Sequence, residues 1–80
     1  MANQRLNAII TGGASGLGRA LALRLARDGW NIAICDINDE AGAAVVKEVK
    51  AAGGDARFEH LDVTNIDQWQ QLSERLRADW

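Results

Sequence analysis

The sequence predicts an α/β fold, with a three-stranded parallel sheet and helices on both faces. Short apolar runs of strand length alternate three times with longer segments of helical composition or periodicity, a pattern that forms parallel sheets through right-handed crossovers. The first apolar run alternates poorly between apolar and polar residues, which indicates a strand buried on both faces. No linker, repeat or low-complexity tract interrupts the pattern, so the 80 residues are expected to form one small unit.

Composition and charge exclude several classes of function. Nine Lys and Arg residues against 11 Asp and Glu residues give a net charge of −2, without the basic cluster that nucleic-acid binding requires. No apolar run is long enough to span a bilayer, and residues 1–5 lack a signal-peptide core, so we expect a cytoplasmic protein without membrane contact. One Cys and one His make no metal site, and Cys35 is expected to be a buried structural thiol.

The first strand is expected at Leu6–Thr11, and a glycine-rich turn follows it. Residues 11–18 have the sequence Thr-Gly-Gly-Ala-Ser-Gly-Leu-Gly. Glycines remove the side chains that would keep an anion away from the backbone. The first N–H groups of the next helix have no partner within it, and the helix dipole places partial positive charge there. This order of strand, turn and helix therefore predicts a phosphate-binding site.

The first helix is expected at Leu17–Arg27. Leu17, Leu21 and Leu25 recur at a spacing of four with small alanines beside them, whereas arginines supply the wetter side. Small residues near the helix start allow it to lie close to the first strand. Gly29 suits the position just past the helix end.

The second strand is expected at Trp30–Asp36. Asn38 can cap the helix that follows, and the two acidic residues after it place negative charge in the first turn. This second helix extends to Lys50, with basic residues at the favourable end. Gly53 and Gly54 end it.

The third strand is expected at Ala56–Val63, and its more polar composition predicts an edge position. Thr64 and Asp67 then resemble a capping box with Asp in place of Glu. The apolar residues of the last helix recur on one face, at Ile66, Trp69, Leu72, Leu76 and Trp80. The three tryptophans of the chain are expected to be packing anchors.

The spacing of the glycines gives the turn a more specific interpretation. They follow the pattern G-x-x-x-G-x-G, a variant of the Rossmann dinucleotide-binding fingerprint, at Gly12, Gly16 and Gly18. Taken alone, the pattern also fits a tight strand-to-helix turn that merely needs positive φ. A nucleotide P-loop is a further alternative, since Gly13 and Gly18 have its separation. Arg19 and Ala20 stand where that loop requires Lys and Ser or Thr, so the P-loop is rejected.

Two later segments strengthen the dinucleotide hypothesis. Asp36 ends the second apolar run 18 positions after Gly18, near the place where an acid meets the adenosine ribose. Asp62 and Val63 end the third strand-like run. Three consecutive strand ends would then contribute to one crevice, which is where open α/β sheets bind ligands.

These motifs together resemble the N-terminal part of a short-chain dehydrogenase/reductase, across essentially the whole chain. The resemblance rests on residues 11–18, on Asp36 and on the sequence Asp-Val-Thr at 62–64. It implies a half-Rossmann βαβαβα unit with strand order 3-2-1. It also implies a set of cofactor-binding residues, namely Gly12, Ser15, Gly16, Leu17, Gly18, Asp36, Ile37, Asp62 and Val63.

The resemblance gives these residues separate roles. The backbone around Ser15, Gly16 and Leu17 is expected to lie against the cofactor pyrophosphate, and Gly18 to allow close packing of helix and strand. Residues 62 and 63 are expected beside the adenine.

The expected cofactor is NAD. By the resemblance, Asp36 accepts hydrogen bonds from the adenosine ribose, and a carboxylate there repels a 2′-phosphate. NADP-preferring members of the family usually carry a basic residue just before the second motif glycine or just after this acid. This chain has Ser15 and Ile37 at those positions.

The resemblance implies an oxidoreductase that transfers hydride between NAD(H) and a carbonyl or secondary alcohol. Its catalytic Tyr-x-x-x-Lys pair is missing because the chain has no Tyr, and Ser15 belongs to the turn rather than to catalysis. We therefore expect residues 1–80 to be the N-terminal part of a larger NAD-binding domain, without catalytic residues and inactive alone. The small-molecule substrate and a homo-oligomeric assembly would belong to the complete parent enzyme.

Two alternatives from other classes stay open. The chain fits a non-catalytic dinucleotide-binding sensor module, since nothing within 80 residues excludes one. It also fits a folding or interaction fragment that binds no cofactor. In the complete family fold the first strand is central, so its free edge here predicts a marginal, dimeric or aggregation-prone chain.

Overall fold

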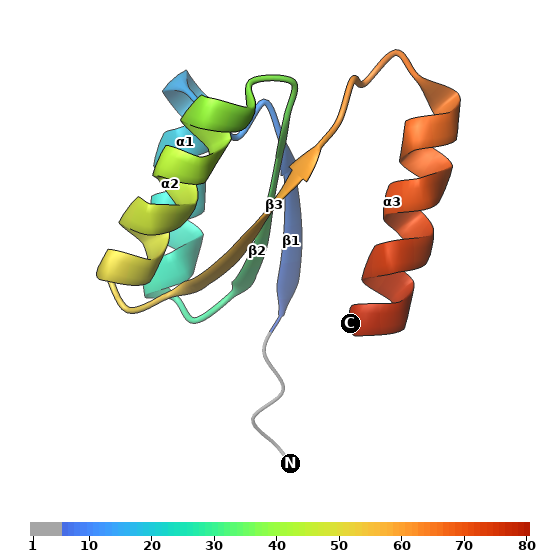
Figure 1. The fold of residues 1–80 in the computed structure, drawn as a ribbon. Coiled ribbons are helices and arrows are strands. Elements are labelled where there is room, and N and C mark those ends of the chain that lie inside the picture. Colours follow the sequence, from blue (N-terminus) through green and yellow to red (C-terminus); the bar gives the residue numbers. More distant parts are fainter. Residues whose placement is uncertain (1–5) are drawn as a thin grey trace.

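The computed structural model describes residues 6–80 and shows three strands alternating with three helices (Figure 1). Residues 1–5, where no signal-peptide core is expected, lie outside the described part. The elements in chain order are β1 (Asn7–Thr11), α1 (Gly16–Arg27), β2 (Asn31–Asp36), α2 (Asp39–Ala51), β3 (Asp55–His60) and α3 (Ile66–Asp79). All pairings are parallel and the strand order is β1-β2-β3, so the predicted half-Rossmann topology is confirmed.

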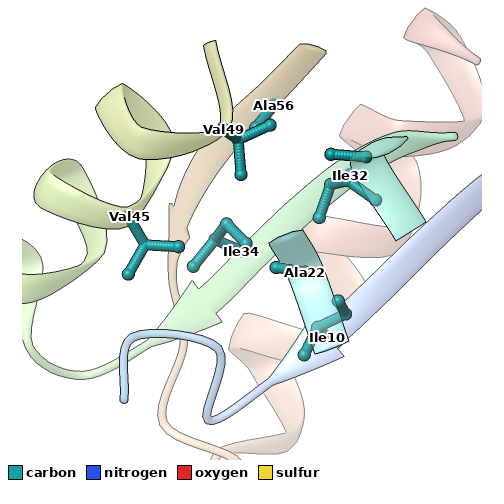
Figure 2. Packing of buried hydrophobic residues seen from close by; sticks show 8 residues of the cluster. Ile10, Ala22, Ile32, Ile34, Val45, Val49 and Ala56 are labelled. Atoms are coloured by element: carbon teal, nitrogen blue, oxygen red, sulfur yellow. The ribbon is translucent and has the colours of Figure 1, made fainter. Parts of the chain in front are cut away.

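The helices cover both faces of the sheet, with α1 and α2 on one face and α3 on the other (Figure 1). Strand β2 is the central strand and carries four consecutive buried residues, 32–35, which alternate between two cores. Figure 2 shows the larger core, between the sheet and the helices α1 and α2, formed by Ile10, Ala22, Ala26, Ile32, Ile34, Val45, Val49 and Ala56. The smaller core, beneath α3, is formed by Ala33, Cys35, Leu61, Leu72 and Leu76.

Strand β1 differs from the expectation of burial on both faces. Ile10 is buried in the larger core, but the side chain of Ile9 on the opposite face is 50% exposed. The reason is that α3 packs on β2, through Ala33 and Cys35, rather than on the edge strand β1. The strand also begins one residue later than expected, although the Leu6 carbonyl still accepts a hydrogen bond from the Asn31 N–H at 2.9 Å.

Helix α1 packs mainly through its alanines, and only Leu25 of the expected leucine row packs against the larger core. Ala22 and Ala26 are buried, whereas Leu17 is 86% exposed and Leu21 is 45% exposed. Small side chains bring the helix close to the sheet, which leaves Leu17 and Leu21 outside the contact. Gly29, with φ of +88°, occupies the position after the helix end as predicted.

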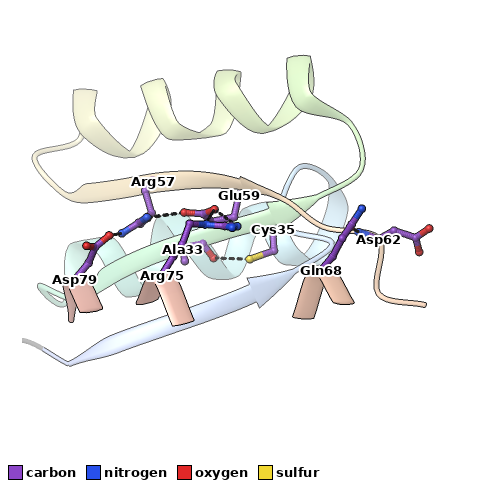
Figure 3. Close-up of polar contacts among 8 residues, drawn as sticks. All are labelled: Ala33, Cys35, Arg57, Glu59, Asp62, Gln68, Arg75 and Asp79. Atoms are coloured by element: carbon purple, nitrogen blue, oxygen red, sulfur yellow. Dashed lines mark hydrogen bonds and ion pairs between the residues drawn. The ribbon is translucent and has the colours of Figure 1, made fainter. Parts of the chain in front are cut away.

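Strand β3 is an edge strand, as predicted, but it ends at His60 rather than at Val63. Its polar composition has a second cause beyond edge exposure. Glu59 is only 8% exposed and points toward α3, where it accepts hydrogen bonds from Arg57 and Arg75, each with an N–O distance of 2.8 Å (Figure 3). Arg57 also binds Asp79 near the end of α3, so these charges fasten the helix to the sheet.

The cap of α3 corrects the predicted capping box. Asn65, not Thr64, is the N-cap, and its side-chain oxygen accepts a hydrogen bond from the Gln68 N–H at 3.1 Å. The expected apolar face is only partly used, because Ile66 is 73% exposed while Leu72 and Leu76 are buried. Among the tryptophans, Trp30 packs against the larger core as expected.

Candidate functional site

The carboxyl ends of the three strands meet at one open groove of about 380 Å³. It is lined by Thr11, Gly12, Asp36, Ile37, Leu61, Asp62 and Val63. Five of these residues belong to the predicted set, and the expected convergence of three strand ends is confirmed. Thr11, the first residue of the glycine-rich motif, and Leu61, which directly precedes Asp62, were not predicted as site residues.

The glycine-rich turn forms one wall of the groove. Gly12 and Gly16 have φ of +66° and +55°, a conformation that L side chains rarely adopt. Ser15 is the N-cap of α1 in extended conformation, and its side chain makes no capping hydrogen bond. No acidic residue stands in the first turn of this helix, so its N–H groups are available to an anion.

Gly18 holds the helix against this turn. A Cβ atom at this position would lie 2.3 Å from the Gly12 carbonyl oxygen and 2.9 Å from the Cα of Gly13. Only a residue without a side chain permits this approach. The predicted role of Gly18 in close packing therefore has a direct structural basis, although the backbone it contacts is the turn itself.

Asp36 connects the turn to the end of β2. Its Oδ2 accepts a hydrogen bond from the Ala14 N–H at 3.2 Å, and its Oδ1 accepts one from the Asn38 N–H at 3.0 Å. A carboxylate has about four acceptor positions, so these two bonds orient it while retaining capacity for further donors. The half-buried Asp36 is thus a fixed acceptor in the wall of the groove.

Asp62 and Val63 lie in the loop between β3 and α3, on the opposite side of the groove. Asp62 Oδ1 accepts hydrogen bonds from the Thr64 N–H at 2.9 Å and from the Thr64 hydroxyl at 2.6 Å. These two bonds lower the pKa of the Asp62 carboxyl, with a smaller contribution from the charge of His60. These bonds therefore favour the ionised form of Asp62.

The structure separates the predicted residues into two groups. Gly12, Asp36, Ile37, Asp62 and Val63 line the groove itself. Ser15, Gly16 and Leu17 lie at the start of α1, beyond the lining, and Gly18 lies beneath the turn. This arrangement offers a ligand an acceptor and apolar contacts within the groove and backbone donors at its glycine end.

Two basic side chains near the strand ends and the glycine turn contact acidic residues of α2. His60 Nδ1 lies 2.5 Å from Asp39 Oδ1 at the start of α2. Arg19, in the first turn of α1, forms an ion pair with Glu48 of α2, with a 2.8 Å bond from its Nε. This pair raises the pKa of Arg19 and lowers the pKa of Glu48.

Two other kinds of site receive no support from residues 6–80. No group of three or more His, Cys, Asp or Glu side chains in this part of the chain could hold a metal ion. None of its three helices is long and apolar enough to cross a bilayer.

The fold and the groove define the nucleotide-binding α/β class of proteins. Members of this class combine a parallel sheet with a glycine turn, an exposed helix start and an acid at the end of the second strand. Within this class, the chain belongs to the short-chain dehydrogenase family, whose sequence profile matches residues 6–80. The family resemblance drawn from the motifs is thereby confirmed.

Individual relatives give the same assignment. The chain is 55% identical over 62 residues to the 2,5-dichloro-2,5-cyclohexadiene-1,4-diol dehydrogenase LinX of Sphingobium indicum. The aligned region covers 78% of this chain and 25% of LinX. A metagenomic short-chain oxidoreductase in complex with NADP superimposes with a TM-score of 0.90 at 28% identity, covering 92% of this chain and 34% of the other. A short-chain dehydrogenase/reductase from Burkholderia phymatum in complex with NAD gives a TM-score of 0.84 at 35% identity, over 90% and 26% of the two chains.

The chain thus spans about a quarter of the length of LinX. It covers 34% and 26% of the two neighbouring structures.

Proposed function

We propose that this chain is the NAD(H)-binding part of an oxidoreductase that transfers hydride between the nicotinamide and a carbonyl or secondary alcohol. Membership of the short-chain dehydrogenase family supports this reaction class, as does the similarity to a diol dehydrogenase. The observation that carries the proposal is the carboxylate of Asp36, fixed by two backbone amides and facing the groove where three strands end. When bound, the nicotinamide supplies the hydride chemistry, and the residues described here hold the other end of the cofactor.

Each side of the groove has a distinct task in this proposal. The N–H groups at the start of α1, around Ser15, Gly16 and Leu17, bind the pyrophosphate. The remaining acceptor positions of Asp36 bind the ribose hydroxyls. The apolar side chains at 37 and 63, which are 65% and 55% exposed, supply flat contact surface for the adenine.

The preference for NAD over NADP follows from charge. A 2′-phosphate on the ribose would meet the Asp36 carboxylate, and like charges at hydrogen-bond distance repel. Ser15 and Ile37 offer no cation in compensation, and Arg19 is already paired with Glu48. Solved neighbours bind either cofactor, so the discrimination depends on these particular residues.

We further propose a cytoplasmic location and a homo-oligomeric complete enzyme. The free buried thiol of Cys35 suits a reducing compartment. Homo-oligomerisation is the family expectation given above for the complete parent.

A titration with NADH tests the proposed cofactor site. Tryptophan emission overlaps the absorption of reduced nicotinamide, and the chain is small enough for energy transfer from its tryptophans to a bound cofactor, so this transfer reports the affinity. Asp36→Ala removes charge-assisted hydrogen bonds and is expected to weaken NADH at least about tenfold. Asp36→Ala combined with Ile37→Arg is expected to shift the preference toward NADPH.

The matched control is Asp55→Ala, which removes an exposed carboxylate at the opposite, amino end of the sheet. It should leave NADH affinity unchanged. An unchanged ratio of NADH to NADPH affinity in the double variant would overturn the role of Asp36. A complete lack of energy transfer with the unaltered chain would instead favour the fragment that binds no cofactor.

A further inference from the structure

Two side chains from the first turn of α3 hold the loop that forms the adenine side of the groove. Gln68 Oε1 accepts a hydrogen bond from the Asp62 N–H at 2.7 Å, and Figure 3 shows the two residues side by side. Trp69 donates from its indole Nε1 to the Val63 carbonyl oxygen at 2.9 Å. The Asp62 N–H and the Val63 carbonyl, which make these bonds, belong to residues that line the groove.

We propose that Gln68 and Trp69 are positioning residues that set the affinity for the adenosine end of the ligand. The inference rests on the proposed function, because it concerns the same groove. In addition, α3 holds the loop, so that residues outside the groove lining determine the position of residues 62 and 63.

Apart from the N-cap of α3 at Asn65, the other hydrogen bonds within residues 62–65 are local to the loop. Asn65 N–H donates to the Asp62 carbonyl at 2.9 Å, and Thr64 donates to the Asp62 carboxylate. These bonds shape residues 62–65 into a turn. The turn is joined to the sheet through the buried Leu61, whose N–H donates a hydrogen bond to the Asp36 carbonyl at 3.0 Å. Beyond Leu61, its place depends on the contacts to α3, which are the two bonds to Gln68 and Trp69 and the cap at Asn65.

Helix α3 is itself firmly attached, so it can serve as the support. Leu72 and Leu76 are buried against the sheet in the smaller core. Arg75 binds the nearly buried Glu59 of β3 through two hydrogen bonds. The path of support therefore runs from the sheet through α3 to the first helical turn, and from there to the loop.

Burial does not explain Trp69. Its ring is 37% exposed and is absent from both cores, unlike Trp30, which packs against the larger one. The hydrogen bond fixes the Val63 backbone while leaving the Val63 side chain 55% exposed. That is the arrangement expected where a side chain must be held in place and still meet a ligand.

The test measures two ligands on the same chain, with AMP as the probe of the adenosine side and inorganic pyrophosphate as the probe of the glycine turn. Amide chemical shifts of a nitrogen-15-labelled sample report both affinities, even in the millimolar range. Trp69→Phe keeps an aromatic ring and removes the donor. It is expected to weaken AMP about three- to tenfold, the effect of one net hydrogen bond, with pyrophosphate affinity unchanged.

Gln68→Met, which removes the acceptor at nearly constant size, is the second variant and is expected to act in the same direction. Trp30→Phe is the matched control, because it makes the same ring change in the core and should leave AMP affinity unchanged. Thermal unfolding by circular dichroism shows that each variant is folded.

The outcomes separate the two proposals. If the unaltered chain binds AMP and both variants at 68 and 69 bind it equally well, the positioning role is wrong and the proposed function stands. Equal weakening of AMP and pyrophosphate would show that Trp69 supports the fold as a whole and would also overturn the inference. If the unaltered chain binds neither AMP nor NADH, the proposed function itself fails.

Discussion

The close contact between Gly18 and Gly12 makes the substitution Gly18→Ala a demanding test of the structure. In a helix interior without other contacts, this change stabilises a protein by about 1 kcal/mol, because Ala has the higher helix propensity. Here the added methyl would lie 2.3 Å from the Gly12 carbonyl oxygen and 2.9 Å from the Gly12 carbonyl carbon. Ordinary contact begins near 3.4 Å, so helix and turn must separate by about 1 Å.

The clash is expected to win over the gain in helix propensity. Backbone atoms cannot rotate away as a side chain can, so the cost lies in the upper part of the range for overpacking, about 2–3 kcal/mol, and the net loss after the gain in helix propensity is about 1–2 kcal/mol. A domain of this size has a total stability on the order of 4–12 kcal/mol, so the loss is a large share. With a urea dependence of about 1 kcal/mol per molar, the unfolding midpoint should fall by about 1 M or more.

Urea unfolding followed by circular dichroism measures this effect, and the pyrophosphate titration measures the damage to the turn. Gly29→Ala is the matched control, because Gly29 has φ of +88° but no atom within 4 Å of the added methyl. It should cost about 1–2 kcal/mol through backbone conformation alone and leave pyrophosphate affinity unchanged. A Gly18→Ala chain as stable as the original would refute the contact and, with it, the position of α1 against the turn.

Two further predictions concern ionisable groups. Thr64→Val removes one of two donors to Asp62 and is expected to raise the pKa of that carboxyl toward its ordinary value. Because the pKa of this acid is lowered in the folded chain, its contribution to stability is present at neutral pH and is lost as the pH falls through the folded pKa. Carbon-13 NMR of the Asp62 carboxyl during an acid titration measures the pKa, and an unchanged titration would contradict the hydrogen bonds. Burial, with a smaller effect of Glu59, raises the pKa of the Cys35 thiol to about 11. The reactive thiolate is therefore scarce at pH 8, and alkylation by iodoacetamide should be about 100-fold slower than in the urea-unfolded chain. Equal rates would contradict the burial of this thiol.

The parts of the site built from backbone could be predicted from sequence. A glycine-rich turn between a strand and a helix has few structural alternatives, so the positions of Gly12, Gly16 and Gly18 determine its conformation. Asp36 could be placed because parallel strands that start together also end together. The register confirms this, since Thr11 pairs with Cys35 and the strand ends share one edge of the sheet.

The parts that depend on packing partners could not be predicted. Leu17, Leu21 and Leu25 form a regular apolar row, but a helix that must approach a glycine turn needs small residues in the contact, and the alanines supply them. Apolar composition likewise extended the third strand through Val63, although Leu61 leaves the strand to fill the core beneath α3. Hydrophobicity favours burial but does not show which element a residue packs against, and Leu17 and Ile66 are exposed despite it.

The contacts of Gln68 and Trp69 show a further limit of sequence reasoning. Both lie in a helical segment whose periodicity indicates core packing, and neither belongs to a motif. Their hydrogen bonds go to backbone groups of a loop six residues away, and backbone partners leave no mark in the sequence. Only an unexplained polar atom on an otherwise apolar side chain, the indole nitrogen of Trp69, could have indicated that this ring has a second task.

The position of Asp36 also determines how its substitution must be interpreted. Its two oxygens accept hydrogen bonds from the amides of Ala14 and Asn38, which belong to the loops after β1 and β2, so one carboxylate both joins those loops and faces the groove. Removing it takes away the proposed ribose contact and, at the same time, a bond between the glycine turn and the end of β2. Pyrophosphate affinity separates these effects. A pure loss of the ribose contact leaves pyrophosphate binding unchanged, whereas a displaced turn weakens it as well, and only the first result assigns the recognition of the ribose to Asp36 itself.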